Sequence, residues 1–487
     1  MTVAADVRTK YEAVIGLEVH VQLLTKSKIF CSCSTRFGDP PNSNTCPVCL
    51  GLPGALPVLN REAVTMAMKA AMALNCSINP RSRFARKNYF YPDLPKGYQI
   101  SQYDEPVSQD GWIGVEVNGA CKRIGITRVH LEEDAGKSLH EGFADSEEKS
   151  YIDLNRTGVP LIEIVSEPDL RTPEEAYEYL TRLKEIMLHL NVSDCNMEEG
   201  SLRVDANVSV RRAGADAFGT KTEVKNLNSF RFLQRALAYE IERQVEILES
   251  GGQITQETRL FDSREGRTYG MRSKEYAHDY RYFPEPDLLP LVITEEWKEE
   301  VQRSLPELPD ALRQRFVMQY GVSNNDAAYL TFSPPTAKYF EEFASASGNP
   351  KEAANWMQRD LAHHLKAAGK DFSDCLVTPA ASGQLLKYVT QGTISRTMAK
   401  DILDEMFSTG KPLEVVMDEG GRTQITDPNT IAAAVREIMA ANPKQLEQYR
   451  GGKTATFGWF VGQVMKATRG QANPQLVQEI LKKELGQ

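Results

Sequence analysis

Polar and apolar residues alternate along several short segments of the first 290 or so residues. In IGLEVHVQL (Ile15–Leu23), Glu18, His20 and Gln22 alternate with leucine and valine, and this period of two predicts a β-strand. The segments ITRVHLEED and LRVDANVSVRR show the same period. Residues 111–134 predict a hairpin that turns at Asn118-Gly119, because Asn-Gly suits the tightest hairpin turns.

Two predicted helices interrupt these strands. The sequence Thr172-Pro173-Glu174-Glu175 is a capping box with proline in the first turn, and it predicts a helix that runs to about Leu190. A second helix begins at Asn228 or Ser229 and ends at Gly251-Gly252. Strands and helices in this irregular order favour an α+β fold on a mixed or antiparallel sheet over a doubly wound one.

The hydrophobic pattern changes near residue 295. Pro306 and Pro309 mark the change, and the apolar positions beyond them follow the period of an α-helix. A second break, rich in glycine and proline, spans residues 408–430. A chain of 487 residues suits about three domains. We therefore predict an α+β domain over 1–295, an all-α helical domain over 296–410 and a small helical tail domain over 411–487.

Composition and charge narrow the class of protein. Hydrophobic residues make up 41% of the chain and charged residues 25%, which is ordinary for a globular protein. No apolar run approaches the length of a membrane helix and the N-terminus lacks a signal peptide, so we expect a cytoplasmic protein without membrane contact. The net charge of −9 argues against a generally basic surface for nucleic acid. Residues 411–487 hold ten basic and eight acidic residues, so any attraction for RNA is expected there or in local patches.

Four of the eight cysteines form two close pairs in CSC-x12-CPVC. These are Cys31, Cys33, Cys46 and Cys49. Paired cysteines in a cytosolic protein more often hold zinc than form disulfides, and four thiolates complete a tetrahedral shell. The pattern therefore predicts a structural zinc knuckle over residues 31–49. The alternative is a first pair that simply lies in a strand and a CPVC pair that is redox-active or inert.

Carboxylates and histidines recur on the polar sides of the predicted strands. In VHLEED, alternation places His130, Glu132 and Asp134 on one face and Glu133 on the other. The strand-like segments GLEVHV, LRVDANV and KTEVKNLNS add further polar side chains. These are Glu18, His20, Arg203, Asp205, Asn207, Glu223, Lys225, Asn226 and Asn228. If the strands are neighbours in one sheet, the carboxylates converge, and such a cluster is stable around a hard cation such as Mg²⁺ with substrate phosphates. The alternative is a set of solvated acidic surface strands.

Known nucleotide motifs are missing from the chain. Gly452-Lys453-Thr454 resembles the end of a Walker A motif, but Glu447 stands where the motif requires glycine. The polar loops 87–106 and 153–169 carry lysine, arginine and aromatic residues that suit a phosphate or a stacked base. An ATP site here would therefore use metals bound by carboxylates on an open sheet, and catalysis would consist of positioning and charge neutralisation.

The motifs together resemble one protein family. GLEVHVQL, CSCS…CPVCLGLPGALPVLN, KNYFYPDLPKGYQISQ, HLEEDAGK, DLNRTGVPLIEIVSEPD and KTEVKNLNSFRFLQRA occur in the order seen in the B subunit of the glutamyl/aspartyl-tRNA amidotransferase. The resemblance covers essentially the whole chain. It implies a catalytic domain related in fold to glutamine synthetase, a helical domain and a tail that contacts tRNA.

The resemblance also implies an ATP-dependent ligase that forms carbon–nitrogen bonds with glutamine as the amide donor. ATP would phosphorylate the side-chain carboxylate of glutamate on tRNA(Gln) or of aspartate on tRNA(Asn), and ammonia would displace the phosphate. An amidase A subunit would supply the ammonia and a small C subunit would bridge the two chains. This chain lacks the glycine-rich Ser-Ser motif of an amidase, which agrees with that division of work.

Site residues carry over by position from the family motifs. The implied catalytic residues and magnesium ligands are Glu18, His20, Glu132 or Glu133, Asp205 and Glu223. The residues we assign to ATP or substrate are Lys96, Tyr98, Arg156, Arg203, Lys225 and Asn226. The implied zinc ligands are the four paired cysteines, and the tRNA contacts in the tail are Lys453, Lys466 and Arg469. Two other functions stay open at this point: a free-standing carboxylate–amine ligase, and a zinc-bearing tRNA adaptor without catalysis.

Overall fold

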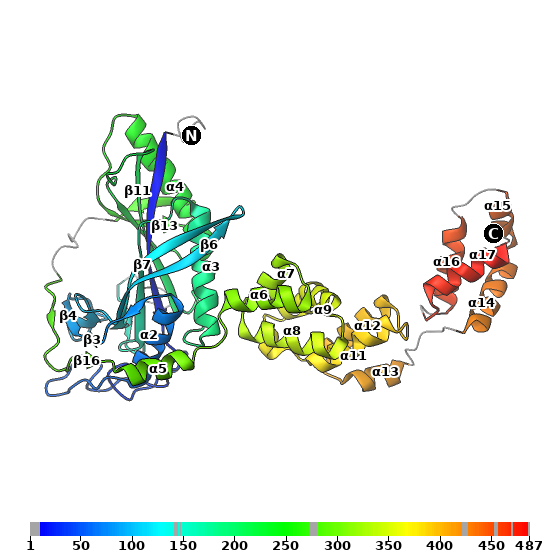
Figure 1. Ribbon diagram of the computed structural model, residues 1–487, viewed down its shortest axis with the longest axis horizontal. Helices are drawn as coiled ribbons and strands as arrows, with labels where there is room; N and C mark the ends of the chain where they lie inside the picture. Colours follow the sequence, from blue (N-terminus) through cyan, green and yellow to red (C-terminus); the bar gives the residue numbers. More distant parts are fainter. Residues whose placement is uncertain are drawn as a thin grey trace. The chain divides into compact units, whose positions relative to one another are not determined.

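The structure is a computed structural model that describes residues 10–140, 145–146, 148–271, 280–420, 427–451, 456–468 and 471–485. The chain divides into two compact units, Met1–Leu308 and Pro309–Gln487, and each is considered by itself (Figure 1). Within the described residues, none of the helices is both long enough and apolar enough to cross a membrane.

A nine-stranded sheet forms the centre of the first unit. Its order is β14-β13-β12-β11-β1-β10-β7-β6-β2, and every neighbouring pair is antiparallel except β12 with β13. The strands are β1 (Tyr11–Gln22), β2 (Ser77–Ile78), β6 (Ser108–Val117), β7 (Ala120–Glu133), β10 (Pro160–Ser166), β11 (Leu202–Arg212), β12 (Thr222–Lys225), β13 (Thr258–Asp262) and β14 (Arg267–Gly270). The predicted α+β fold on a mixed sheet is confirmed.

Three smaller sheets complete the first unit. The three-stranded sheet has the order β15-β4-β5, and its strands are β4 (Phe84–Asn88), β5 (Tyr98–Gln102) and β15 (Phe283–Pro284). The other two pair β3 (Arg81–Ser82) with β16 (Leu291–Val292) and β8 (Lys137–Leu139) with β9 (Tyr151–Asp153). β5 lies beside the end of β7, where Gln99 Nε2 donates to the Glu133 carbonyl oxygen at 2.7 Å.

Helices bury one face of the large sheet and leave the other face polar. These helices are α2 (Arg61–Ala73), α3 (Pro173–His189) and α4 (Phe230–Glu249), which contact β7, β6 and β11. Leu17, Val19 and Val21 of β1 are buried in the core beneath them. Because strand residues alternate between faces, Glu18 and His20 lie on the opposite face. The hydrophobic pattern of β1 thus decides which side of the sheet carries the chemistry.

Local signals in the sequence explain where the elements begin and turn. Thr172 Oγ1 accepts from the Glu175 backbone N–H and caps α3, and Ser229 caps α4 in the same way through the Phe232 N–H. The hairpin of β6 and β7 turns at Asn118 and Gly119, whose φ angles are 54° and 77°. Positive φ at both positions is what the predicted two-residue turn requires.

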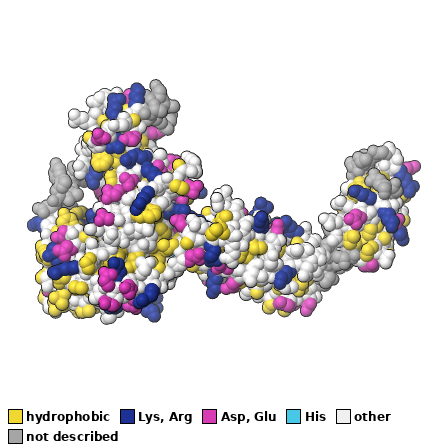
Figure 2. Space-filling view, viewed as in Figure 1, with side chains coloured by type: hydrophobic (Ala, Val, Ile, Leu, Met, Phe, Trp, Pro, Cys, Tyr) yellow, Lys and Arg dark blue, Asp and Glu magenta, His cyan; other side chains and the backbone are white. Residues whose placement is uncertain are grey.

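The second unit is helical and contains two hydrophobic cores. The first core involves α6 (Pro309–Tyr320), α7 (Asn324–Leu330), α8 (Pro334–Ser347), α9 (Pro350–Trp356), α11 (Pro379–Thr390), α12 (Arg396–Thr409) and α13 (Leu413–Gly420). A π-helical turn at Met357–Leu361 joins α9 to α10 (Ala362–Ala367). The second core involves α14 (Pro428–Ala441), α15 (Pro443–Arg450), α16 (Thr456–Ala467) and α17 (Pro474–Leu485). On the face shown in Figure 2, acidic and basic side chains are interspersed over these helices.

Helices beside both predicted domain boundaries pack into the core of the preceding part of the chain. The sequence places α5 (Glu295–Arg303) at the start of the helical domain, but its Val301 is buried in the core of the first unit. The sequence places α13 in the tail, but its Leu413 and Val416 pack in the core of α6–α12. An amphipathic helix at a boundary shows its apolar face in the sequence but not the core that the face will cover.

Candidate active site

The register of the large sheet aligns the polar side chains of four central strands. His20 on β1 lies opposite Glu163 on β10, which in turn lies opposite His130 on β7. On the other side of β1, Glu18 lies opposite Asp205 on β11. Residues directly opposite in an antiparallel pair share a face, so these side chains all lie on the face away from the helices.

The tightest group on this face consists of His20, Glu132 and Glu163. One ligand atom from each lies within 4.8 Å of the other two, which is close enough for all three to contact a single metal ion. His20 Nε2 lies 3.7 Å from a Glu132 oxygen and 3.6 Å from a Glu163 oxygen. Carboxylate oxygens suit Mg²⁺, so this donor set fits the predicted metal.

Sequence reasoning missed Glu163. It is the only charged residue of β10 (PLIEIVS), and a single glutamate within an apolar run was the signal that could have identified it. Lying between His20 and His130, it is central to the group, and its distance to His130 Nε2 is 3.1 Å.

Buried opposite charges determine the ionisation of this group. Burial disfavours the charged form of His130, but the carboxylates of Glu163 and Glu132 outweigh that effect and raise the pKa of His130 to about 9. Burial likewise opposes ionisation of Glu163, and the two histidines nevertheless hold the pKa of Glu163 well below its usual range. Burial raises the pKa of Glu18, and the Glu163 and Glu223 carboxylates raise it further. A nearby cation would therefore favour the charged form of Glu18, which burial and the neighbouring carboxylates disfavour.

A second group lies on the same face, on β11 and β12. Lys225 Nζ contacts Asp205 at 2.8 Å and Glu223 at 3.0 Å, so the lysine bridges the two predicted ligands. Asn207 Nδ2 donates to Glu18 at 2.9 Å and ties this group to β1. The Asn226 side chain, a predicted substrate contact, donates to the Phe261 carbonyl at 2.9 Å.

Asp134 anchors the two predicted arginines. Its carboxylate accepts two hydrogen bonds from Arg203, both at 3.0 Å, and lies 3.7 Å from Arg156 Nε. Gln22 Nε2 donates to it at 2.7 Å. Burial opposes ionisation of Asp134, but the arginines outweigh this and lower its pKa to about 2. Arg203 stays one-third exposed beside His20, where a fixed guanidinium can contact an anionic substrate.

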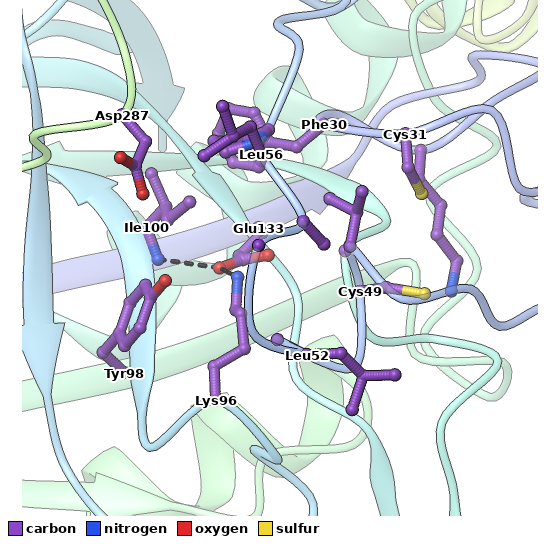
Figure 3. A pocket seen from close by; sticks show the side chains of 17 residues that line it. Phe30, Cys31, Cys49, Leu52, Leu56, Lys96, Tyr98, Ile100, Glu133 and Asp287 are labelled. Carbon is purple, nitrogen blue, oxygen red and sulfur yellow. Dashed lines mark hydrogen bonds and ion pairs between the residues drawn. The ribbon is translucent and has the colours of Figure 1, made fainter.

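Glu133 is the exception among the predicted metal ligands. It points to the opposite side of β7, where its carboxylate accepts from the Ile100 N–H at 2.8 Å and pairs with Lys96 (Figure 3). Lys96 and Tyr98 line a pocket of about 190 Å³ together with Glu133, Cys31 and Cys49. The structure therefore separates Glu133, Lys96 and Tyr98 from the group around His20, because neighbouring residues of a strand face opposite sides.

The structure brings together the four paired cysteines. Their sulfur atoms lie within 4.8 Å of one another. The Cys46 N–H donates to Cys49 Sγ at 3.0 Å, as in a knuckle that turns its amides toward a thiolate. Hydrogen bonding from Cys31 lowers the pKa of Cys49 to about 4, and the nearby Lys28 ammonium favours the same thiolate. Four converging cysteines form a closed donor set that is consistent with a structural zinc ion.

Only one of the three predicted tail contacts lies within the described residues. Lys466 is exposed in the last turn of α16, whereas Lys453 and Arg469 lie outside the described residues. Phe460 is fully buried and Trp459 packs partly against the same core, so these two aromatic residues stabilise the tail helices.

Comparison with known proteins identifies the family. Residues 13–299 match the model of the GatB/GatE catalytic domain, and residues 338–485 match that of the GatB domain. The B subunit of the aspartyl/glutamyl-tRNA(Asn/Gln) amidotransferase from Carboxydothermus hydrogenoformans is 57% identical over 98% of this chain and 99% of its own length. The protein of the same name from Thermodesulfovibrio yellowstonii is 54% identical over the same shares. The chain belongs to this amidotransferase B-subunit family.

The ranges matched by the amidotransferase B-subunit family include the candidate site. The whole polar face, from β12 through β7, lies within residues 13–299, the range matched by the catalytic domain. The helices α8 to α17 lie almost entirely within the second matched range. The family resemblance predicted from the motifs is confirmed.

Proposed function

We propose that the polar face of the nine-stranded sheet phosphorylates and then amidates the side-chain carboxylate of glutamate on tRNA(Gln), of aspartate on tRNA(Asn), or of both. As a member of its family, the chain is a subunit of a tRNA-dependent amidotransferase. The observation that carries the proposal is the convergence of His20, Glu132 and Glu163 beside Glu18 on an open sheet face of the catalytic domain.

In the first step, an oxygen of the substrate carboxylate attacks the γ-phosphorus of ATP, and ADP leaves. Mg²⁺ held by His20, Glu132 and Glu163, with Glu18 and the Asp205–Glu223 group nearby, would neutralise charge on the phosphates. Arg203, fixed by Asp134, contributes a positive charge beside them. The product is an acyl phosphate. Its phosphate is a far better leaving group than the oxygen of an unactivated carboxylate.

In the second step, ammonia attacks the acyl carbon and the bond to the phosphate oxygen breaks. The attacking nitrogen must lose a proton, and a carboxylate of the same face can accept it. We assign this role to Glu18, which lies two residues from His20 on the same face of β1. The products are the amide on tRNA and inorganic phosphate.

The proposal requires partners that make ammonia. We assign glutamine hydrolysis to an amidase A subunit, with a small C subunit in a heterotrimer, and misacylated tRNA as the substrate. We assign a structural Zn²⁺ to Cys31, Cys33, Cys46 and Cys49, away from the reacting atoms. We also keep Lys96 and Tyr98 as candidate substrate contacts at the pocket beside Glu133.

The test separates the work of this chain from that of its partners. Purified alone, the chain should not hydrolyse glutamine. With partners, ATP and misacylated tRNA, it should form the amide equally well when ammonium replaces glutamine. Glutamine hydrolysis by the isolated chain, or ammonium-dependent amidation without ATP cleavage, would contradict the proposal.

A further inference from the structure

Five tyrosines from separate segments form an aromatic patch beside the acidic group. They are Tyr89, Tyr91, Tyr103, Tyr280 and Tyr282. Tyr89 contacts Tyr91 and Tyr280 edge to face, with ring centroids 5.7 and 5.8 Å apart, and Tyr280 contacts Tyr282 at 6.3 Å. Tyr103 completes the run by stacking on Tyr282. The rings are thus in contact from Tyr91 through to Tyr103.

The outer end of the aromatic patch is an open stacking surface. The rings of Tyr103 and Tyr282 are 4.2 Å apart and nearly parallel, with an interplanar angle of 10°. Tyr103 is nevertheless 56% exposed, and Tyr91 is 52% exposed. One face of the Tyr103 ring is therefore covered by Tyr282 and its remaining surface is available to another flat ring. Unpaired bases stack on exposed aromatic rings of this kind, which are supported on one face by another ring.

The middle of the aromatic patch, at Tyr89 and Tyr280, adjoins the candidate metal group. Lys87 Nζ lies 4.8 Å from the centroid of Tyr280 and 5.8 Å from that of Tyr89. Lys87 lies opposite Gln99 in the β4–β5 pair, and two residues farther along β5 the Ser101 hydroxyl donates to a Glu132 oxygen at 3.1 Å. The aromatic patch therefore extends from the acidic group outward to solvent.

The segment that supplies most of the aromatic patch is basic. Residues 80–103 contain five lysines and arginines and one acidic residue, in a chain whose net charge is −9. Arg83, Arg86 and Lys96 are paired with carboxylates of Asp104, Glu285 and Glu133. We therefore base the contact with a single-stranded nucleic acid on stacking between the rings and the bases.

We propose that the aromatic patch binds the unpaired 3′ end of the tRNA that carries the amino acid, with a base stacked on Tyr103. The inference rests on the proposed function, since the carboxylate to be phosphorylated is attached to that end of the tRNA. Two well-exposed rings, Tyr91 and Tyr103 at the two ends of the patch, fit separate bases of a strand better than the single adenine of ATP. The patch thus places the 3′ end so that the amino acid reaches the acidic group.

The test uses the chain in complex with its partner subunits. Tyr103→Ala removes the ring, Tyr103→Phe keeps it, and Tyr269→Ala is a control at an exposed tyrosine of the edge strand β14. Tyr103→Ala should raise KM for misacylated tRNA about tenfold or more, with KM for ATP unchanged. Tyr103→Phe and Tyr269→Ala should behave as the wild type.

Binding of uncharged tRNA supplies a second measurement. The wild-type complex should lose affinity when the last three nucleotides are removed from the 3′ end, whereas Tyr103→Ala should bind the intact and shortened tRNAs equally. A rise in KM for ATP instead of tRNA would overturn the proposal in favour of ATP, and equal values for all variants would exclude a stacking role. Amidation by the wild-type complex tests the proposed function separately, so either claim can fail without the other.

Discussion

Glu223 depends on a side chain of the next strand for its orientation. Thr258 Oγ1 donates to Glu223 Oε2 at 2.7 Å, and the Glu223 N–H donates to the Glu257 carbonyl at 3.0 Å. Thr258 lies directly opposite Glu223 in the one parallel pair of the sheet, between β12 and β13. The outer strand β13 thus orients one of the predicted metal ligands.

Replacing Thr258 tests this arrangement. Thr258→Val keeps the shape and removes a hydrogen bond to a charged group, a bond worth about 1.5–3 kcal/mol, so tRNA-dependent ATP cleavage should fall about tenfold or more. Thr258→Ser restores the hydroxyl and should restore most of the rate. The two variants should unfold at similar temperatures; equal activity of Thr258→Val and the wild type would show that Glu223 needs no such support.

Single residues show which parts of the site a sequence reveals. Strand alternation correctly separated Glu132 from Glu133, because the side-chain period of a strand is two. It did not reveal Glu163, whose strand carries no other charged residue. Nor did it show that Asp134 would bind two arginines, since those contacts depend on strand order, which the pattern of one strand does not contain.

At the scale of elements, the cysteine loop brings together two pairs that are apart in the sequence. The pairs converge although 12 residues separate Cys33 from Cys46, and Lys28 Nζ, just before the first pair, donates to the Asn44 carbonyl at 2.7 Å. The spacing of the pairs was sufficient to predict this convergence, because ligand spacing in a knuckle is local.

Cys46→Ser tests whether the loop holds zinc. With one thiolate removed, the purified protein should contain much less zinc and the loop should be cleaved more readily by protease, because a closed tetrahedral shell has been opened. Cys121→Ser, at an exposed cysteine outside the cluster, should retain the metal. Wild-type protein prepared without oxygen and found free of zinc by metal analysis would show that the four cysteines have another role.

At the scale of the whole molecule, the tail has its own small core. Ile431, Val435, Phe460, Val477 and Leu481 are all fully buried within it. The sequence showed the helical period of this region, but proline and glycine breaks located its start only approximately, because α13 packs in the neighbouring core. A unit with its own core can be removed with little effect on the folding of the rest.

Deletion of residues 427–487 tests the predicted role of the tail. The truncated protein should bind tRNA more weakly, and its affinity should depend less steeply on salt concentration, because phosphate contacts are lost. The first unit should still unfold cooperatively at its usual temperature. Unchanged tRNA affinity across a salt titration would place the binding surface elsewhere on the chain.

The central claim is that the polar face of the sheet holds the metal for phosphoryl transfer, and Glu132→Gln tests it most directly. The substitution keeps the size of the side chain and removes one anionic ligand from the group with His20 and Glu163. The decisive measurement is tRNA-dependent acyl-phosphate formation by the complex at limiting Mg²⁺, with glutamine hydrolysis by the partner recorded in the same sample. Glu116→Gln, at an exposed position of β6, serves as the control.

We predict that Glu132→Gln lowers acyl-phosphate formation at least about a hundredfold, because losing the charge costs several kcal/mol of stabilisation. Added Mg²⁺ should restore part of the rate by mass action, and glutamine hydrolysis and the Glu116→Gln control should stay unchanged. Near-normal acyl-phosphate formation by Glu132→Gln at limiting Mg²⁺ would contradict the account.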